Sequence, residues 1–372
     1  MTGPVVITGG GTGGHVFPML AVAGALREAG LSSKELRFVG SRRGQERELL
    51  SDGDVALTLL PGRGLRRSWR SKDVLANVGA VLGLAGALAS AIVLLRRWRP
   101  SVVVSVGSYA SFATSVAAMC WRTPLVLVEL DATPGLAQRI VANYARKRCC
   151  AFPATGEKVV VTGAPIRDVI ETVDRSRASR DAAKAALVPP IDADRKVVVV
   201  MTGSLGSTRV NYAVRELADV WHARSDRTIL HVTGRRDFND VSTRRPQSGA
   251  LDYRVIDFGD MAELWTLCDV AICRAGAVTV AELTLLSIPS ILVPLPGAPG
   301  DHQTKNAETV VGVGGAQLLR DRDCTGPALA SLLDTMMDPM TLASMARGAG
   351  TLAKREAARA IATVVLDVRD AP

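Results

Sequence analysis

One local plan occurs twice along this chain, and it limits the possible folds more than any other feature. A short apolar segment, a loop rich in small residues and a helical pattern follow one another from Val5–Thr8, and again from Val197–Met201. Further short apolar segments follow each copy, at 36–39, 102–106 and 124–129 and then at 228–232, 270–273 and 290–293. Apolar strands that alternate with helices predict parallel sheets. We therefore expect an α/β protein with two similar open sheets.

A polar stretch at 171–195, rich in Arg and Asp and containing Pro189 and Pro190, separates the two copies. Such a stretch is typical of a linker, and 372 residues suit two domains. We expect an N-terminal domain at 1–170, a linker at 171–195, a C-terminal domain at 196–340, and a helical segment at 341–372 that returns to the first domain. Sheets that face each other place a ligand cleft between their strand ends.

The composition excludes several classes of protein. With 48% hydrophobic and 22% charged residues the chain is not disordered, and 4% aromatics argue against a base-stacking nucleic-acid surface. The net charge of +9 suits diphosphates or an anionic membrane. The six cysteines lack zinc-ligand spacing and fit a reducing cytoplasm, and the N-terminal residues do not resemble a signal peptide.

The run from Val74 to Leu95 is long enough to cross a membrane. Much of it is Ala and Gly, and basic residues flank it on both sides. Three alternatives stay open: a helix packed in or at the edge of a folded domain, which we favour; a helix lying on an anionic membrane surface; and, least favoured, a true span.

The strongest local motif is Gly9-Gly10-Gly11-Thr12-Gly13-Gly14-His15, between a strand and a helix. Glycines let the backbone approach an anion, and a helix N-terminus offers unpaired N–H groups. The string also fits G-x-G-x-x-G, and Arg42-Arg43 after the second strand would suit NADP. His15 inside the loop instead suits a general base beside a diphosphate.

Three later clusters follow strands in the second half. Gly203–Ser207 is a second loop of small residues between a strand and a helix, and it too could bind a phosphate. Cys273–Glu282 places Glu282 early in a helix, where its carboxylate can accept hydrogen bonds from a ribose diol. Asp301–Asn306 follows the strand at 290–293 and can read sugar hydroxyls. The pair Asp192-x-Asp194 resembles a metal-binding motif but lies in the expected linker, and we predict no metal site there.

Taken together, these motifs resemble those of the MurG family of bacterial glycosyltransferases, in the same order and from about Val5 to Leu319. The matching segments are Gly10–His15 with Pro18, Gly135–Ala137 with Arg139, Gly163 with Pro165 and Arg167, Phe258 with Asp260–Ala262, Arg274–Glu282, and Asp301–Ala307. The resemblance implies the GT-B fold, in which two Rossmann-like domains face each other across a cleft and the C-terminal one holds most of the donor nucleotide.

The resemblance also implies an activity: inverting transfer of N-acetylglucosamine (GlcNAc) from UDP-GlcNAc to lipid I, giving lipid II in peptidoglycan synthesis. His15 or Asp131 is then the candidate base. The expected acceptor-diphosphate residues are Gly11, Gly13, Gly14, Gly107 and Tyr109. The expected UDP-GlcNAc residues are Thr12, Gly13, Gly14, Asp131, Arg167, Ser204, Phe258, Ala277, Val278, Thr279, Glu282, His302 and Gln303.

From the same resemblance we expect no cofactor and no required metal. The implied partners are UDP-GlcNAc, a polyprenyl-diphosphate-linked acceptor, an anionic membrane surface and other cell-wall synthesis proteins, but no nucleic acid. The implied location is peripheral, on the cytoplasmic side of the plasma membrane.

The chain departs from the family's motifs at positions expected to line the cleft. The family's HEQN is Val128-Glu129-Leu130-Asp131 here, Leu205 replaces a Gln, and Ala164 replaces an Asn. These changes leave open a related enzyme that acts on another lipid-phosphate acceptor, such as a phosphoglycolipid. An NADP-dependent oxidoreductase and a non-catalytic UDP-sugar-binding relative are less favoured alternatives.

Overall fold

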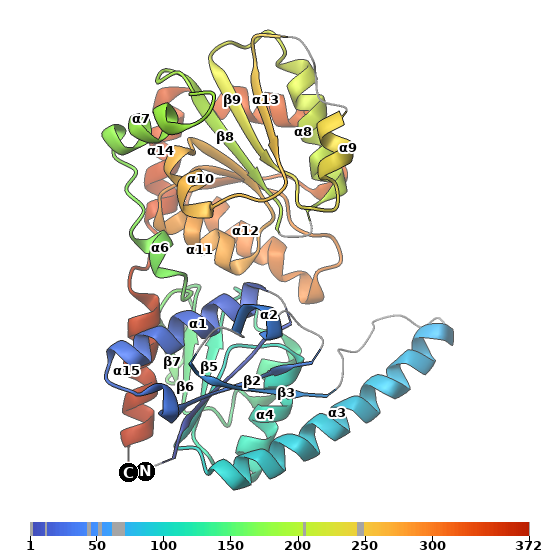
Figure 1. Ribbon diagram of the computed structural model, residues 1–372, viewed down its shortest axis with the longest axis vertical. Coiled ribbons are helices and arrows are strands. Elements are labelled where there is room, and N and C mark those ends of the chain that lie inside the picture. The colour runs from blue at the N-terminus through green and yellow to red at the C-terminus, as the bar shows by residue number, and fades with distance from the viewer. Residues whose placement is uncertain are drawn as a thin grey trace. The chain divides into compact units, whose positions relative to one another are not determined.

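The structure is a computed structural model that describes residues 3–11, 13–42, 46–50, 54–61, 71–203, 206–243 and 249–371. It divides into two compact units: unit 1 is Met1–Arg167 with Glu356–Pro372, and unit 2 is Asp168–Arg355. Each unit contains one sheet (Figure 1), and the strand pairs within each sheet are parallel. The predicted α/β class with two parallel sheets is confirmed.

The sheet of unit 1 has the strand order β3-β2-β1-β4-β5-β6-β7. β1 and β4 lie at its centre and are completely buried, because helices cover both faces. Their register aligns Val5 with Val102, so the loops that follow both strands leave the sheet at one edge. The strands are β1 (Val5–Thr8), β2 (Leu36–Ser41), β3 (Ala56–Leu60), β4 (Val102–Ser105), β5 (Leu125–Glu129), β6 (Lys147–Cys150) and β7 (Val159–Val161).

The helices of unit 1 include one that comes from beyond unit 2 in the chain. α15 packs against α1, buries Ile361 and Val365, and pairs Arg359 with Glu28 at 3.1 Å. The helices of this unit are α1 (Gly13–Glu28), α2 (Glu46–Leu50), α3 (Ser71–Trp98), α4 (Tyr109–Cys120), α5 (Leu136–Val141) and α15 (Ala357–Asp370).

α1 begins at Gly13, inside the Gly9–His15 motif that was expected to precede the helix. Pro18 lies inside the helix, where it lacks one backbone donor but does not end the helix. The earlier start shortens the glycine loop and puts Gly13, Gly14 and His15 in the first helical turn. The N–H groups of that turn have no partner within the helix.

α3 packs against α4 through one narrow stripe, formed by the buried residues Ala87, Ala91 and Leu95. Outside the stripe the described part of α3 is largely exposed, and Leu82 and Val93 are 69% and 68% exposed. By length and apolar composition alone, Val81–Trp98 would be able to cross a membrane, and 17% of this segment is buried.

The sheet of unit 2 has the order β10-β9-β8-β11-β12-β13. Its core packs α8 and α13 against the sheet around Val200, Leu217 and Leu333. The strands are β8 (Lys196–Met201), β9 (Arg227–Val232), β10 (Asp252–Ile256), β11 (Val270–Cys273), β12 (Ser290–Leu292) and β13 (Ala316–Leu318). The helices are α6 (Asp168–Glu171), α7 (Arg177–Ala186), α8 (Thr208–Val220), α9 (Phe238–Thr243), α10 (Met261–Leu267), α11 (Ala277–Leu285), α12 (His302–Gly312), α13 (Gly326–Met336) and α14 (Pro339–Gly350).

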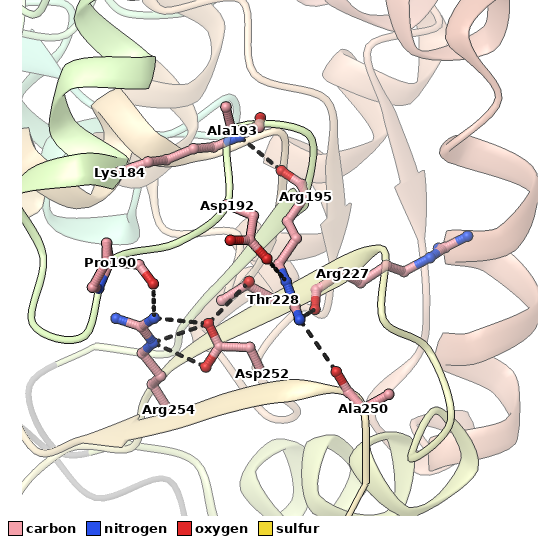
Figure 2. A network of polar contacts seen from close by, with 10 residues as sticks. All are labelled: Lys184, Pro190, Asp192, Ala193, Arg195, Arg227, Thr228, Ala250, Asp252 and Arg254. Atoms are coloured by element: carbon pink, nitrogen blue, oxygen red, sulfur yellow. Dashed lines mark hydrogen bonds and ion pairs between the residues drawn. The ribbon is translucent and has the colours of Figure 1, made fainter.

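The stretch 171–195, expected to be a linker, lies within unit 2 and contains α7. Figure 2 shows how its end is held: Lys184 Nζ donates to the carbonyls of Ala193 and Arg195 at 2.6 and 2.7 Å. Arg254 on β10 donates to the carbonyl of Pro190, also drawn in Figure 2, and to the carbonyl of Pro189. Lys184 and Arg254 thus donate hydrogen bonds to backbone oxygens at the end of the stretch 171–195. This stretch is therefore packed against the rest of unit 2 and is not a solvated linker.

The two connections between the units fall at 167/168 and 355/356. The expected domain limits were 170 and 341, so α14 belongs to unit 2 while α15 alone returns to unit 1. A break at 351–356, where Glu356 takes a left-handed conformation (φ 56°), separates these two helices.

Candidate functional site

In unit 1 the glycine loop leaves the carboxyl end of β1 and turns directly into α1. Gly10 and Gly11 have φ values of 126° and 95°, a region that disfavours any side chain. The N–H of Gly11 donates to Glu46 Oε1 at 2.9 Å, and the N–H of Ser41 donates to the same oxygen at 2.8 Å. Gly11 N–H is therefore occupied by the protein, and Gly13 and Gly14 lie at the start of α1, where the helix dipole favours an anion.

Glu46 is a residue that sequence reasoning missed. It is the first residue of α2, its side chain is 0% exposed, and it lies below the loop. A Cβ atom on Gly40 would come within 2.9 Å of its Cγ, so the neighbouring glycine makes room for it. No periodic pattern marks this residue, because its partners are five and 35 positions away.

His15 and Gly107, predicted from separate motifs, lie side by side. A Cβ atom on Gly107 would be 3.4 Å from His15 Nε2 and 3.7 Å from Gln138 Nε2. Gln138 is fixed by donating to the carbonyl of Val128 at 2.8 Å. The loops after β1, β4 and β5 therefore meet around the His15 ring. Tyr109 begins α4, and its side chain lies outside the described residues.

Asp131 stands two residues beyond β5 and is half-buried, while its neighbour Glu129 is deep in the sheet. Glu129 accepts two hydrogen bonds from Arg148, both at 2.9 Å, and one from the Cys150 thiol at 3.3 Å. Burial raises the pKa of that thiol to about 12. These contacts tie Glu129 to β6, so Asp131 is the carboxylate of this segment that lies nearer the solvent.

Arg167, expected to hold the donor diphosphate, belongs to unit 1. Its guanidinium lies 5.1 Å from the centre of the Phe17 ring on α1. This cation–π contact places the charge near the helix that starts with the glycine loop.

In unit 2 the loop after β8 leads into α8. Thr12 of unit 1 and Ser204 of this loop, both expected at the donor site, lie outside the described residues, as does Leu205. Gly203 and Gly206 have φ values of 95° and 71°, and a Cβ atom on Gly206 would collide with the carbonyl of Thr233.

Arg274, at the end of β11, joins three loops at this edge. It donates to Ser207 Oγ at 2.6 Å, to the carbonyls of Val293 and Pro294 at 3.0 and 3.1 Å, and pairs with Asp321 at 2.7 Å. Arg274 belongs to the predicted motif at 274–282, in which it had no assigned role, and its contacts show that it holds these loops together.

The first turn of α11 consists of Ala277, Val278 and Thr279, whose N–H groups have no partner within the helix. Glu282 follows in the next turn and is 5% exposed. Its Oε2 accepts a hydrogen bond from Trp265 Nε1 at 2.9 Å. Trp265 is a second residue that sequence reasoning missed.

Phe258 is 65% exposed and lies under Arg235, whose guanidinium is 5.9 Å from the ring centre. Its N–H already donates to Asp257 Oδ1 at 2.8 Å. Of its backbone groups, the carbonyl is therefore the one better placed to read a base.

His302 and Gln303 begin α12 and are half-buried. Gln303 Oε1 accepts from the N–H of Leu295 at 2.9 Å, so its Nε2 is the donor end of that amide. Asn306 donates to the carbonyl of Ala275 at 3.1 Å and links α12 to the turn before α11. The structure thus brings the expected residues of α11 and α12 to one edge of the unit 2 sheet.

Comparison with known proteins agrees with this arrangement. Residues 5–149 match the glycosyltransferase family 28 N-terminal domain, and residues 197–363 match the family 28 C-terminal domain. The UDP-N-acetylglucosamine–N-acetylmuramyl-(pentapeptide) pyrophosphoryl-undecaprenol N-acetylglucosamine transferases of Alkalilimnicola ehrlichii and Pseudomonas aeruginosa are 37% and 36% identical, each over 99% of both chains.

Among solved structures, MurG of Acinetobacter baumannii superimposes with a TM-score of 0.80 and 26% identity, covering 98% of this chain and 99% of that one. The chain therefore belongs to glycosyltransferase family 28 and, within it, to the MurG family of GT-B enzymes.

Proposed function

We propose that this enzyme transfers GlcNAc from UDP-GlcNAc to lipid I, the undecaprenyl-diphosphate-linked N-acetylmuramyl-pentapeptide, to give lipid II in peptidoglycan synthesis. The observation that carries the proposal is similarity over 99% of the chain to transferases whose names state this donor and this acceptor. The two sets of loops at the carboxyl edges of the sheets support it, because each leads into a helix start suited to a phosphate.

Unit 2 is proposed to bind the donor. Glu282 accepts from the ribose diol, and the carbonyl of Phe258 contacts the uracil. The first turn of α11 at 277–279, together with Ser204, faces the diphosphate, and Gln303 with His302 contacts the GlcNAc hydroxyls. Asp131, Thr12 and the N-terminal glycines are the proposed contacts from unit 1.

Unit 1 is proposed to bind the acceptor diphosphate through Gly11, Gly13, Gly14, Gly107 and Tyr109, of which Gly13 and Gly14 lie at the start of α1. His15 or Asp131 takes the proton from the attacking acceptor hydroxyl. The acceptor oxygen bonds to the anomeric carbon as the bond from that carbon to the UDP oxygen breaks. UDP leaves with the electron pair, and the anomeric configuration inverts.

The departing diphosphate needs positive charge, which we propose comes from this chain rather than from a metal ion. Arg167 supplies a fixed charge, since its guanidinium is held over the Phe17 ring. Helix-start N–H groups supply further donors that are already oriented before the reaction.

We further propose that α3 rests on the cytoplasmic face of the membrane and brings the enzyme to its lipid-linked acceptor. Its exposed residues Val81, Leu82 and Val93 are apolar, and the exposed Arg96 and Arg97 follow them. An apolar helix face next to basic residues suits the surface of an anionic bilayer.

Transfer of labelled GlcNAc from UDP-GlcNAc to purified lipid I tests the function directly, and no product would contradict it. His15→Ala should lower turnover by about 10²–10⁴-fold if His15 is the base, and Asp131→Asn provides the matched test of the carboxylate. Glu282→Ala should mainly weaken donor binding, and an unchanged affinity for UDP-GlcNAc would remove it from the ribose.

Asp131 favours one second candidate, the same chemistry on a different lipid-phosphate acceptor. A carboxylate at the position where the family has Asn repels a diphosphate and alters what the acceptor site accepts. Turnover of another polyprenyl-phosphate acceptor, with none of lipid I, would establish it. Thermal stabilisation by NADPH and not by UDP would instead indicate an oxidoreductase, and UDP-GlcNAc binding without turnover would indicate a non-catalytic relative.

A further inference from the structure

A buried pair in unit 2 joins a tryptophan on α10 to the carboxylate of Glu282 on α11. Trp265 is 0% exposed and Glu282 is 5% exposed, and the distance from Nε1 to Oε2 is 2.9 Å. A buried indole N–H needs an acceptor, and a buried carboxylate needs donors. One hydrogen bond therefore gives the indole its acceptor and holds the Oε2 atom of the carboxylate.

The tryptophan itself is held from both ends of its helix. Asp260 caps α10 by accepting from the N–H of Ala262 at 2.8 Å. At the other end, Arg175 donates to the carbonyls of Trp265 and Cys268. Because α10 begins three residues after Phe258, one short and anchored helix connects the proposed uracil contact to the proposed ribose contact.

From this geometry we propose that Trp265 is a positioning residue for recognition of the ribose. By holding Oε2, it aims the Glu282 carboxylate at the 2′- and 3′-hydroxyls and so makes the donor site prefer a ribonucleotide over a 2′-deoxyribonucleotide. The inference rests on the proposed binding of a UDP-sugar in unit 2, and it adds the residue that sets this preference.

The size of the preference follows from the hydrogen bond that a deoxynucleotide cannot make. A hydrogen bond to a charged group contributes about ten- to hundredfold in affinity, and a site built to bind a hydroxyl disfavours the analogue that lacks it. If the indole orients the carboxylate, removing the indole N–H should reduce the ratio of the affinities for the ribonucleotide and the deoxyribonucleotide. It should not weaken the binding of both nucleotides equally.

The experiment measures the dissociation constants of UDP and 2′-deoxy-UDP by calorimetry and compares their ratio between variants. The wild type should prefer UDP by about tenfold or more. Trp265→Phe removes the N–H and should bring the ratio close to one, mainly by weakening UDP. Trp265→His, which keeps a ring N–H, should keep more of the preference than the Phe variant.

Trp221→Phe is the matched control. Trp221 is 2% exposed in the same unit, and its Nε1 has no hydrogen-bond partner among the described residues. Its replacement loses the same ring volume without losing a hydrogen bond, so it should leave the ratio unchanged. If Trp265→Phe weakened UDP and 2′-deoxy-UDP equally, its role would be structural and the inference would be overturned.

Glu282→Gln separates failure of the inference from failure of the proposed function. A reduced ratio in Glu282→Gln, together with an unchanged ratio in Trp265→Phe, would overturn the inference alone. An unchanged ratio in Glu282→Gln, or no binding of UDP to the wild type, would overturn the ribose assignment and the inference with it.

Discussion

Replacing Glu46 should release the glycine loop of unit 1. In the native protein Oε1 accepts the N–H groups of Gly11 and Ser41, at 2.9 and 2.8 Å, from a completely buried position. Glu46→Ala leaves both amides without this acceptor. A hydrogen bond to a carboxylate contributes about 1.5–3 kcal/mol, so the loss of both costs about 3–6 kcal/mol.

Hydrogen exchange measured by mass spectrometry reports this loss where it occurs. A local cost of about 3–6 kcal/mol corresponds to a rise of roughly 10²–10⁴-fold in the exchange of segments 9–14 and 38–42. Segments of unit 2 serve as the internal reference and should not change. The loop is also the proposed acceptor site, so the KM for lipid I should rise more than the KM for UDP-GlcNAc, most of whose proposed contacts lie in unit 2.

Glu46→Gln is the matched control because its amide oxygen still accepts both N–H groups. Exchange at Gly11 and Ser41 should therefore stay much closer to the wild type than in the Ala variant. Equal exchange in Glu46→Ala and the wild type would show that the carboxylate does not hold the loop. A Gln variant as damaged as the Ala variant would show that the charge, and not the acceptor oxygen, matters.

Three further predictions concern other parts of the chain. Complete burial lowers the pKa of His231 to about 3, so below about 6.5 the unfolded chain binds a proton that the folded chain does not. As the pH is lowered from about 6.5, the free energy of unfolding should then fall by about 1.4 kcal/mol per pH unit. Urea unfolding at several pH values should show a smaller slope in His231→Gln but not in His222→Gln. Equal slopes in the two variants would refute the prediction. Cys120 is exposed, whereas burial raises the pKa of the other five thiols, so one equivalent of a thiol reagent should react quickly and Cys120→Ser should abolish that phase. Leu82→Asp with Val93→Asp should lower co-sedimentation with anionic vesicles at least tenfold while UDP binding stays unchanged; undiminished sedimentation would remove α3 from the membrane surface.

The central strands were predictable because they are buried on both faces. β1 and β11 coincide with the predicted segments, and β4 and β8 differ by one residue, since a run of Val and Ile has no other stable place in such a fold. β3 and β7 were not predicted although both are mainly apolar, because β7 has only three residues, fewer than a typical strand, and Thr58 interrupts β3.

The loops that carry the candidate sites were also predictable, because each follows a recognisable strand. The residues that hold these loops and their side chains in place were not predictable. Glu46 and Trp265 act on partners that are 35 and 17 positions away, and such contacts leave no period in the sequence. Similarly, Lys184 looked like a solvated linker residue, although it is 4% exposed and donates to two backbone carbonyls.

The return of α15 to unit 1 has a consequence for biosynthesis. Unit 2 occupies an unbroken stretch of chain and is complete in sequence before α15 is made, whereas the face of α1 that α15 covers waits through the synthesis of all of unit 2. At about 5–20 residues per second this delay lasts roughly 10–40 s. During that time an apolar surface of unit 1 is exposed on the ribosome-bound chain. Unit 1 therefore becomes complete only after unit 2, although most of its residues are made first.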